Sequence, residues 1–437
     1  MNRERTKTAQ HDHGSQVPVQ IEKPVYGGSF LARLEGKAIF VPLTLPGEEA
    51  RVRIIEEKRS YATAEPETIV TPAPNRAEPG CRHFGACGGC QYQHADYESQ
   101  LAFKQAILRE TLERGGVHSP EQIEILAGDP WHYRNRIRLA VDSAGRMGYR
   151  ARRSHTIVPI EECPIAAPAL VGAVMSAGEV LRSLRFNMNL AELSLFSNAN
   201  QTEVLVTLFA QNRVHRPIEQ FAQQLKDSVP ALKGVQLVAM DRTGQAAETI
   251  GEWGSSFLTY NVGGIDYRVE QRAFFQVNRW LLDKFVDRVT AARRGAIAWD
   301  LFAGVGLFAR RLAAGFDEVV AVESSAESAR TLGTNLESST ARSLTTDVAT
   351  FLGSKAARSR PDLIVVDPPR TGLGGEVSSL LASAGAQTIV YVSCDPATLA
   401  RDLRVLIGAG YAVSSVTLVD LFPQTFHLET VVELQRS

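Results

Sequence analysis

Hydrophobic and polar residues alternate in short runs between residues 17 and 75. Residues 17–22, 37–41 and 49–56 are runs of this kind, and Gly-Gly, Glu-Gly and Pro-Gly steps separate them. Alternation with period two is typical of strands that bury one face, and glycine and proline between such runs indicate turns. This stretch therefore predicts a small OB-like β-barrel, followed by a proline-rich linker.

The periodicity changes in the rest of the chain. Apolar residues have helical spacing over residues 95–115, strand-like runs dominate residues 123–265, and residues 274–294 again favour a helix. From residue 295 onward, short apolar strands alternate with spans rich in alanine and leucine. That alternation is typical of a doubly wound parallel sheet with helices on both faces.

Together these patterns predict a multidomain α/β protein, as suits a chain of 437 residues. We expect a disordered polar tail, an N-terminal β-barrel, a central β-rich α+β domain that holds a cysteine cluster, and a C-terminal Rossmann-like sheet. The expected bounds of these four parts are residues 1–16, 17–75, 76–265 and 266–437.

Composition narrows the class of protein. The formal net charge is −1, so affinity for nucleic acid must come from local basic patches. No apolar run approaches the ~18 residues of a membrane-spanning helix, and the first seven residues lack the apolar core of a secretory signal. Five cysteines in so long a chain do not form a disulfide framework. We expect a cytoplasmic protein that does not bind membranes.

A glycine-containing loop follows the first strand of the C-terminal sheet. Its sequence is Asp-Leu-Phe-Ala-Gly-Val-Gly at residues 300–306, where Gly304 lets the backbone approach a ligand closely. Glu323 ends the next strand, where an acid can bind a ribose diol, and Asp347 ends a third strand, where it can accept from an adenine amine. A structural turn and a nicotinamide site are alternatives. The missing third glycine favours S-adenosylmethionine over a dinucleotide.

Two further motifs follow strands of the same sheet. Residues 363–366 are an apolar strand that delivers Asp367-Pro368-Pro369-Arg370, whose prolines stiffen the chain and hold Asp367 and Arg370 at the mouth of a site. The alternative is a rigid strand-to-helix turn. Cys394 follows the apolar strand 388–392 and precedes a helix, whose start we expect to lower the pKa of the thiol. A buried structural cysteine is the competing interpretation, and we favour a nucleophile.

Glu429 stands at the beginning of the last, mostly apolar strand. Burial there raises the pKa of a carboxyl group and suits a general base, although a surface cap is an equal alternative.

Three cysteines lie close together and a fourth is remote: Cys81, Cys87, Cys90 and Cys163. Four thiolates suit zinc or an iron–sulfur cluster. Zinc sites usually show two close pairs, so the three-plus-one spacing favours a [4Fe–4S] cluster over zinc. A cluster with four protein ligands has no open iron, so we expect it to be structural or to position RNA.

Residues 130–155 carry seven arginines, four of them at 146–153, against the single acid Asp142. Trp131, Tyr133 and Tyr149 lie among them. Arginines mixed with aromatic rings suit contacts with phosphates and stacking on unpaired bases. A solvated strand face is the alternative, and we favour RNA binding.

Taken together, these motifs resemble the RNA uracil-5-methyltransferase family that carries a TRAM domain and an iron–sulfur cluster. The resemblance covers nearly the whole chain after residue 16. It rests on the four cysteines, Phe275-Gln276-Val277-Asn278, the loop from Asp300, Asp367-Pro368-Pro369-Arg370, Ser393-Cys394-Asp395-Pro396 and His427-Leu428-Glu429-Thr430. The order of these motifs makes the resemblance specific.

The resemblance implies that the N-terminal barrel is a TRAM RNA-binding domain and that the C-terminal sheet is a methyltransferase domain. It implies S-adenosylmethionine contacts at Gln276, Phe302, Glu323 and Asp367, with Cys394 as nucleophile and Glu429 as base. The chain departs from the family at Leu307, where relatives often have asparagine, and at Ala303, where cysteine is common. A polar cofactor contact at Leu307 is therefore in doubt.

The implied reaction methylates C5 of a uridine. Addition of the Cys394 thiolate to C6 makes C5 nucleophilic, a base then removes the C5 proton, and Arg370 is a candidate donor to the enolate. The target base must leave its stack. We expect 23S ribosomal RNA as the substrate, with the tRNA T-loop second, and a monomer with no stable protein partner.

Two interpretations of other classes compete with this one. Asp367-Pro368-Pro369 also suits a methyltransferase that acts on an amino nitrogen and needs no thiol. The second competitor is a non-catalytic RNA-binding or assembly factor, for which Leu307 would be a sign of decay.

Overall fold

The computed structural model describes residues 16–118, 120–184, 190–211, 218–241, 243–290, 292–337 and 339–437. Apart from residue 16, the predicted tail 1–16 lies outside the described residues. The chain forms two compact units. The first consists of residues up to 85, 90–107 and 424–426, and the second of residues 86–89, 108–423 and 427–437.

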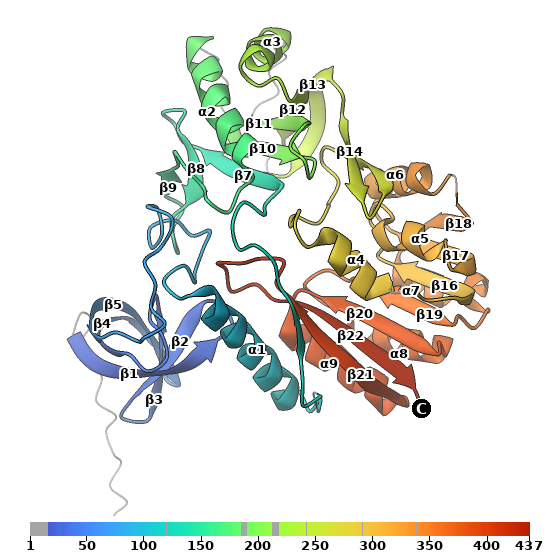
Figure 1. Ribbon diagram of the computed structural model, residues 1–437, viewed down its shortest axis with the longest axis horizontal. Helices are drawn as coiled ribbons and strands as arrows, with labels where there is room; N and C mark the ends of the chain where they lie inside the picture. Colours follow the sequence, from blue (N-terminus) through green and yellow to red (C-terminus); the bar gives the residue numbers. More distant parts are fainter. Residues whose placement is uncertain are drawn as a thin grey trace, which may run out of the picture. The chain divides into compact units, whose positions relative to one another are not determined.

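The first unit contains the predicted β-barrel, which is closed in the order β1-β2-β3-β5-β4 (Figure 1). Its strands are β1 (Gln16–Val25), β2 (Ser29–Leu34), β3 (Lys37–Pro42), β4 (Glu49–Glu57) and β5 (Tyr61–Thr71). Strands β1 and β4 alternate buried and exposed positions over part of their length, and Phe30, Ile39 and Val52 fill the interior. Closure removes the exposed edges that an open sheet of this size would present.

Several basic side chains of the barrel are paired with acids of the barrel itself. Lys37 Nζ lies 2.6 Å from Glu57, and Arg53 Nε lies 2.9 Å from Glu67. Such exposed pairs add little stability, but they reduce the positive charge that the barrel can offer to a phosphate backbone.

Helix α1 (Tyr97–Arg114) confirms the helical spacing predicted over residues 95–115. The carboxylate of Asp96 accepts a hydrogen bond from the amide of Ser99 at 2.8 Å, which caps the helix start. The boundary between the two units falls within this helix, after Ile107.

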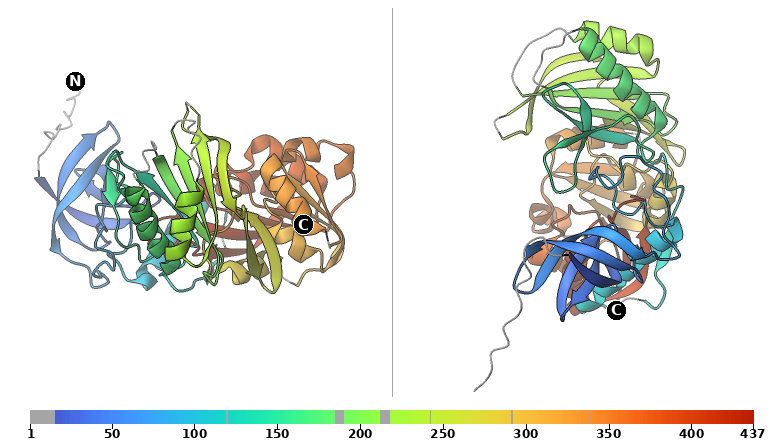
Figure 2. Two further views of the ribbon diagram at one scale, coloured as in Figure 1. Left: turned by 90° about the horizontal axis from the view of Figure 1, so that it is seen from above. Right: turned by 90° about the vertical axis from the view of Figure 1, so that its left-hand side faces the viewer.

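The central part of the second unit is a seven-stranded sheet in the order β13-β12-β11-β10-β7-β8-β9. Its strands are β7 (Arg136–Val141), β8 (Met147–Arg150), β9 (Ile157–Pro159), β10 (Leu190–Ser197), β11 (Val204–Ala210), β12 (Leu232–Met240) and β13 (Ala246–Gly254). Helices α2 (Pro168–Ser183) and α3 (Glu219–Ser228) pack against each other and share one apolar core with the sheet (Figure 2). This confirms a β-rich α+β domain.

The helix predicted over residues 274–294 is shorter in the structure. After the hairpin β14 (Phe257–Val262) and β15 (Ile265–Glu270), helix α4 spans only Leu282–Thr290. The side-chain oxygen of Asn278 accepts hydrogen bonds from the amides of Trp280 and Leu281, and this turn precedes the helix. Periodicity alone does not reveal such a turn, because Phe275, Gln276 and Asn278 before the helix are also buried.

The C-terminal part is an eight-stranded sheet in the order β18-β17-β16-β19-β20-β22-β21-β6. Its strands are β6 (Glu124–Leu126), β16 (Gly295–Leu301), β17 (Phe316–Glu323), β18 (Ala341–Thr345), β19 (Leu363–Val366), β20 (Thr388–Ser393), β21 (Tyr411–Val419) and β22 (Glu429–Arg436). The strands from β18 to β20 are parallel, while β22 is antiparallel to both of its neighbours. The sheet is therefore mixed, although its cofactor half is parallel as predicted.

Helices cover both faces of this sheet (Figure 1). The helices are α4, α5 (Leu307–Leu312), α6 (Ala326–Leu336), α7 (Val348–Leu352), α8 (Gly374–Ala384) and α9 (Pro396–Gly408). Contacts join α4, α5 and α6 in one layer and α7, α8 and α9 in the other, which confirms the doubly wound arrangement. None of the helices in the described part of the chain combines the length and apolar character needed to cross a bilayer.

Candidate active site

The candidate site lies at the carboxyl ends of the parallel strands. From β16 the chain proceeds to β17 and β18 on one side of the sheet, and it then returns to β19 and β20 on the other. The strand order therefore reverses between β16 and β19, and open α/β sheets bind ligands at such a point. The predicted loop at 300–306, Asp367 and Cys394 all follow these strand ends.

The loop after β16 has the backbone of a ligand cradle. Phe302 has φ +66°, a left-handed conformation that a residue with a side chain rarely adopts, and such strain is concentrated at functional sites. Gly304 has φ +56° and no atom within 4 Å of the place where a Cβ would lie, so the loop is open there. The amide of Gly304 donates to Glu323 Oε2 at 2.9 Å. The structure thus brings Gly304 and Glu323 together, as predicted for a cofactor site.

Asp347 has a second role in the ligand-free protein. Its carboxylate caps α7, with the amide of Thr350 donating to Oδ1 at 2.8 Å and the hydroxyl of Thr350 donating to Oδ2 at 2.6 Å. These hydrogen bonds lower the pKa of Asp347. The side chain is exposed near the end of β18, and contact with an adenine amine would have to use the lone pairs that the cap leaves free.

Leu307, at the position where asparagine is often found, is the first residue of α5. Its side chain is 7% exposed and belongs to the main apolar core, and its carbonyl oxygen accepts a hydrogen bond from the Tyr267 hydroxyl at 3.1 Å. An apolar side chain cannot supply a polar contact to the cofactor. Leu307 therefore contributes packing at this point of the loop.

Buried acids surround the loop. Burial raises the pKa of Asp300 to about 7, opposed by a hydrogen bond from the Ala309 amide and helped by the charges of Asp367 and Glu323. Burial also raises the pKa of Asp367 to about 7. The three acids are close enough to influence one another, so a positive group bound among them would be stabilised.

Sequence reasoning gave Asp300 no role beyond opening the motif. In the structure its side chain is fully buried, its Oδ2 accepts from the Ala309 amide at 2.8 Å, and its Oδ1 has no hydrogen-bond partner. A buried carboxylate oxygen without a partner is costly and is often explained by a ligand or water. In the sequence, the burial of Asp300 was indicated only by its position inside an apolar strand.

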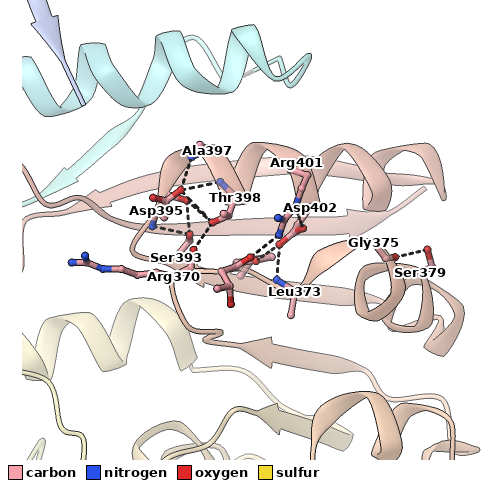
Figure 3. Close-up of polar contacts among 12 residues, drawn as sticks. Arg370, Leu373, Gly375, Ser379, Ser393, Asp395, Ala397, Thr398, Arg401 and Asp402 are labelled. Atoms are coloured by element: carbon pink, nitrogen blue, oxygen red, sulfur yellow. Dashed lines mark hydrogen bonds and ion pairs between the residues drawn. The ribbon is translucent and has the colours of Figure 1, made fainter. Parts of the chain in front are cut away.

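Cys394 lies directly after β20, half-buried, as predicted. Its electrostatic environment contradicts the expected low pKa. Burial raises the pKa of the thiol to about 11, Glu429 and Asp367 add to the rise, and Arg370 opposes it. The helix does not compensate because Asp395 caps it: the carboxylate of Asp395 accepts from the amides of Ala397 and Thr398 at 3.0 and 2.9 Å (Figure 3). Those amides are therefore not directed at the sulfur.

Glu429 is the first residue of β22 and is 4% exposed. Burial raises its pKa well above the ordinary value, the charge of Asp367 adds to the rise, and Arg370 opposes it. Glu429 also interacts with the Cys394 thiol. The structure thus favours a buried carboxyl group near Cys394 over a surface cap.

Arg370 is exposed, and its charge favours the ionised forms of Cys394 and Glu429. Its Nη2 lies 3.2 Å from Nδ1 of His427, two residues before Glu429. In Figure 3 the side chain of Arg370 extends away from the hydrogen bonds around its own backbone. The charge of Arg370 therefore lowers the pKa of both Cys394 and Glu429, the two groups for which the sequence predicted catalytic roles.

Gln276 lies in the buried segment before α4 and is 6% exposed. Its carbonyl oxygen accepts from the side-chain amide of Asn135 at 3.0 Å, and the same amide donates to the Tyr260 hydroxyl at 2.9 Å. The conformation of this segment is thus fixed from outside the cofactor sheet, by residues at the start of β7 and in β14.

The four cysteines of the predicted cluster are each half-buried in the structure. Among the described residues, no group of three or more His, Cys, Asp or Glu side chains is arranged to hold a metal ion. The Cys163 thiol is 3.9 Å from the Tyr149 hydroxyl, and burial raises its pKa. The predicted cluster is therefore unsupported by the geometry.

The arginine-rich stretch is only partly available to RNA. Arg136 is half-buried with its guanidinium 4.0 Å above the ring of Phe196, while Arg138 and Arg146 form ion pairs with Glu192 and Asp142. Exposed side chains are concentrated at the end of the stretch, around Arg150, Arg153 and His155. The sequence did not reveal the contacts that occupy Arg136, Arg138 and Arg146.

Comparison with known families agrees with the architecture. The family described as tRNA (Uracil-5-)-methyltransferase matches residues 96–346 and 355–437, and the TRAM domain family matches residues 10–66. The two matches together cover most of the chain.

Individual relatives extend along nearly the full length. The 23S rRNA (uracil(1939)-C(5))-methyltransferase RlmD of Pectobacterium atrosepticum is 34% identical over 430 residues, covering 92% of this chain and 90% of that protein. An uncharacterised RNA methyltransferase of Aquifex aeolicus is 31% identical, with 96% and 98% covered. The Pyrococcus abyssi tRNA (uracil-54, C5)-methyltransferase, solved with S-adenosyl-L-homocysteine, has a TM-score of 0.77 at 24% identity and covers 95% of this chain and 100% of that one. The last comparison supports the fold.

Proposed function

We propose that this protein methylates a uridine of 23S ribosomal RNA through a covalent bond between Cys394 and C6 of the base. The chain belongs to the tRNA (uracil-5-)-methyltransferase family and is an S-adenosylmethionine-dependent RNA uracil-C5-methyltransferase. The observation that carries the mechanism is the mutual influence of Cys394, Glu429 and Arg370 at the carboxyl end of the sheet, beside the loop of Gly304.

The residues present fit S-adenosylmethionine. The open backbone at Gly304, the Glu323 carboxylate at the end of β17 and the unpartnered oxygen of Asp300 give this end of the sheet polar and acidic groups. When bound, S-adenosylmethionine supplies the methyl group on a positively charged sulfonium, and that charge favours the ionised forms of nearby Cys394 and Glu429. Gln276, Phe302, Asp347 and Asp367 are the further contacts that we propose.

The chemistry proceeds in two stages. In the first, Cys394 loses its proton to solvent and its sulfur bonds to C6, so that the electrons of the C5–C6 double bond move toward O4. These electrons then form the bond from C5 to the methyl group, while the bond from that methyl group to the sulfonium sulfur breaks and S-adenosylhomocysteine leaves. Arg370 lies near enough to oppose the negative charge that develops.

In the second stage, Glu429 takes the proton from C5, the C5–C6 double bond re-forms and the bond from sulfur to C6 breaks. Burial makes Glu429 a stronger base once the sulfonium charge has been lost, because its pKa then rises again. The thiolate of Cys394 leaves and recovers a proton.

We assign RNA binding to the N-terminal barrel and to the exposed arginines near residues 150–153. Because several barrel cations already pair with acids, we expect the arginine segment to contribute more phosphate contacts for its length.

The substrate can be identified in cells. Deleting the gene should remove one 5-methyluridine from the large-subunit ribosomal RNA and leave the tRNA T-loop unchanged, since the named full-length relatives act on 23S rRNA. Mapping 5-methyluridine in both RNA classes, with the gene restored as a control, tests this. Loss of the T-loop modification instead would make the protein a tRNA enzyme.

We also propose that Cys81, Cys87, Cys90 and Cys163 bind one [4Fe–4S] cluster, on the strength of their spacing and soft ligands. Protein purified without oxygen should then be brown and contain equal amounts of iron and acid-labile sulfide. Cys163→Ser should lose both, whereas Cys394→Ser should keep them. Stoichiometric zinc in colourless protein would replace the cluster with a zinc site, and absence of any metal would refute both.

A further inference from the structure

The segment that follows Asp367-Pro368-Pro369 is held by side chains of helix α9 (Figure 3). The hydroxyl of Thr398 donates to the carbonyl oxygen of Arg370 at 3.2 Å. Nη2 of Arg401 donates to the carbonyl oxygen of Thr371 at 2.8 Å. Two consecutive backbone groups of the strand-end loop are thus fixed from the helix that begins beside Cys394.

A third backbone group is held by a buried carboxylate. Oδ2 of Asp402 accepts hydrogen bonds from the amide of Leu373 at 2.7 Å and from the hydroxyl of Tyr391 at 2.8 Å, and its Oδ1 accepts from Nε of Arg401 at 2.9 Å. The Asp402 side chain is 1% exposed. Its charge is therefore stabilised by one cation and two neutral donors, in surroundings where such bonds are strong.

The loop and the helix approach too closely for a side chain between them. Gly372 has φ +69°, and a Cβ on it would lie 2.5 Å from Oδ2 of Asp402 and 2.7 Å from Nη2 of Arg401. Its amide also donates to the carbonyl of Pro369 at 2.8 Å, which closes the turn that contains Arg370. Glycine at this position is therefore part of the same arrangement.

These contacts connect three strand-end features. Tyr391 belongs to β20, whose end carries Cys394, Asp402 belongs to the helix after it, and the loop they hold carries Arg370. The Arg370 side chain is exposed, and its Nη2 contacts Nδ1 of His427, so the location of the guanidinium depends strongly on where its backbone is fixed.

We propose that Arg401 and Asp402, supported by Tyr391, are positioning residues that fix the backbone of Arg370 and thereby hold its guanidinium beside Cys394 and Glu429. This inference rests on the proposed function, because it gives Arg370 a part in the reaction. The hydrogen bonds of Arg401 are to Asp402 and to the backbone of the loop at Thr371, so in this proposal it acts through the loop. Misplacement of a catalytic group by about 1 Å can lower a rate by about a hundredfold.

The test compares Arg401→Gln with Arg404→Gln. Both changes remove one exposed positive charge from the same helix, and only Arg401 is bonded to the loop. The single-turnover rate of methyl transfer should fall about tenfold or more in Arg401→Gln. It should stay within twofold of the wild type in Arg404→Gln. The dissociation constant for S-adenosylmethionine should be unchanged in both variants.

A double-mutant cycle with Arg370→Lys separates positioning from general damage. If Arg401 acts through Arg370, Arg401→Gln should slow the Arg370→Lys enzyme by less than twofold. Tyr391→Phe, which leaves Arg401 in place, should slow methyl transfer in the wild-type background as well. Multiplicative effects in the cycle, or wild-type rates in both Arg401→Gln and Tyr391→Phe, would overturn the proposal.

The same samples show which idea has failed. If the wild-type protein methylates RNA but forms no covalent adduct with 5-fluorouridine RNA, the covalent mechanism is wrong, whereas the positioning role is still judged from the methyl-transfer rates. If the adduct forms and the cycle shows no coupling, the covalent mechanism stands and the positioning role is wrong.

Discussion

Cys394→Ala should form no covalent complex with RNA and should lose methyl transfer by roughly 10⁴-fold or more, the scale seen when a catalytic nucleophile is removed. Without the sulfur, C5 of uracil stays a poor nucleophile. The substrate should contain 5-fluorouridine, because no proton can then leave C5 and the adduct of the wild-type protein persists. Denaturing gel electrophoresis after incubation with S-adenosylmethionine measures the complex.

The control for this variant is cofactor binding. The pKa of the thiol is raised in the ligand-free protein, so the group is neutral at pH 7 and its loss should leave the affinity for S-adenosylmethionine unchanged. Undiminished methylation by Cys394→Ala would show that the reaction does not use this thiol. It would also favour methylation of an amino nitrogen, a reaction that uses Asp367-Pro368-Pro369 and needs no thiol.

Glu429→Gln should add the methyl group and then remain bound to natural RNA as a covalent adduct. The amide keeps the shape of the side chain but cannot take the C5 proton, so multiple turnover should fall by about 10²–10⁴-fold. The first stage should not slow, because the change removes a negative charge that raises the pKa of Cys394. Gel shifts under denaturing conditions, with labelled methyl groups, measure the trapped complex.

Glu433→Gln is the matched control, because Glu433 lies on the same strand and pairs with Arg293 at 2.6 Å. It should turn over like the wild type. Rapid turnover by Glu429→Gln would assign proton removal to another group, and failure even to form the adduct would give Glu429 a role before methyl transfer.

The sequence predicted the parts of the site that depend on neighbouring residues. Asp367 and Cys394 follow apolar runs of four to six residues, and such runs form buried strands whose ends meet at one edge of a parallel sheet. Glu429 was placed for the same reason at the start of β22. The loop of Gly304 was recognisable because glycine is needed wherever φ is positive and a ligand comes close.

Other properties depend on contacts between distant segments, and the sequence did not reveal them. The raised pKa of Cys394 follows from burial of the thiol and then from the charges of Glu429, 35 positions further along the chain, and of Asp367. Arg136 was expected to face RNA, but it packs on Phe196 in a neighbouring strand. Residue types alone do not show which partner neutralises or buries a charge.

The outermost strand of the eight-stranded sheet comes from elsewhere in the chain. β6, residues Glu124–Leu126, pairs in parallel with β21, and Glu124 Oε2 accepts from the Thr417 hydroxyl at 3.0 Å. A fragment that begins at residue 266 would leave the edge of β21 unpaired and open to association with other chains. The residues of this sheet are therefore not contiguous in the sequence. A chimera that exchanges the central domain between relatives should take residues 124–126 from the same parent as the C-terminal part.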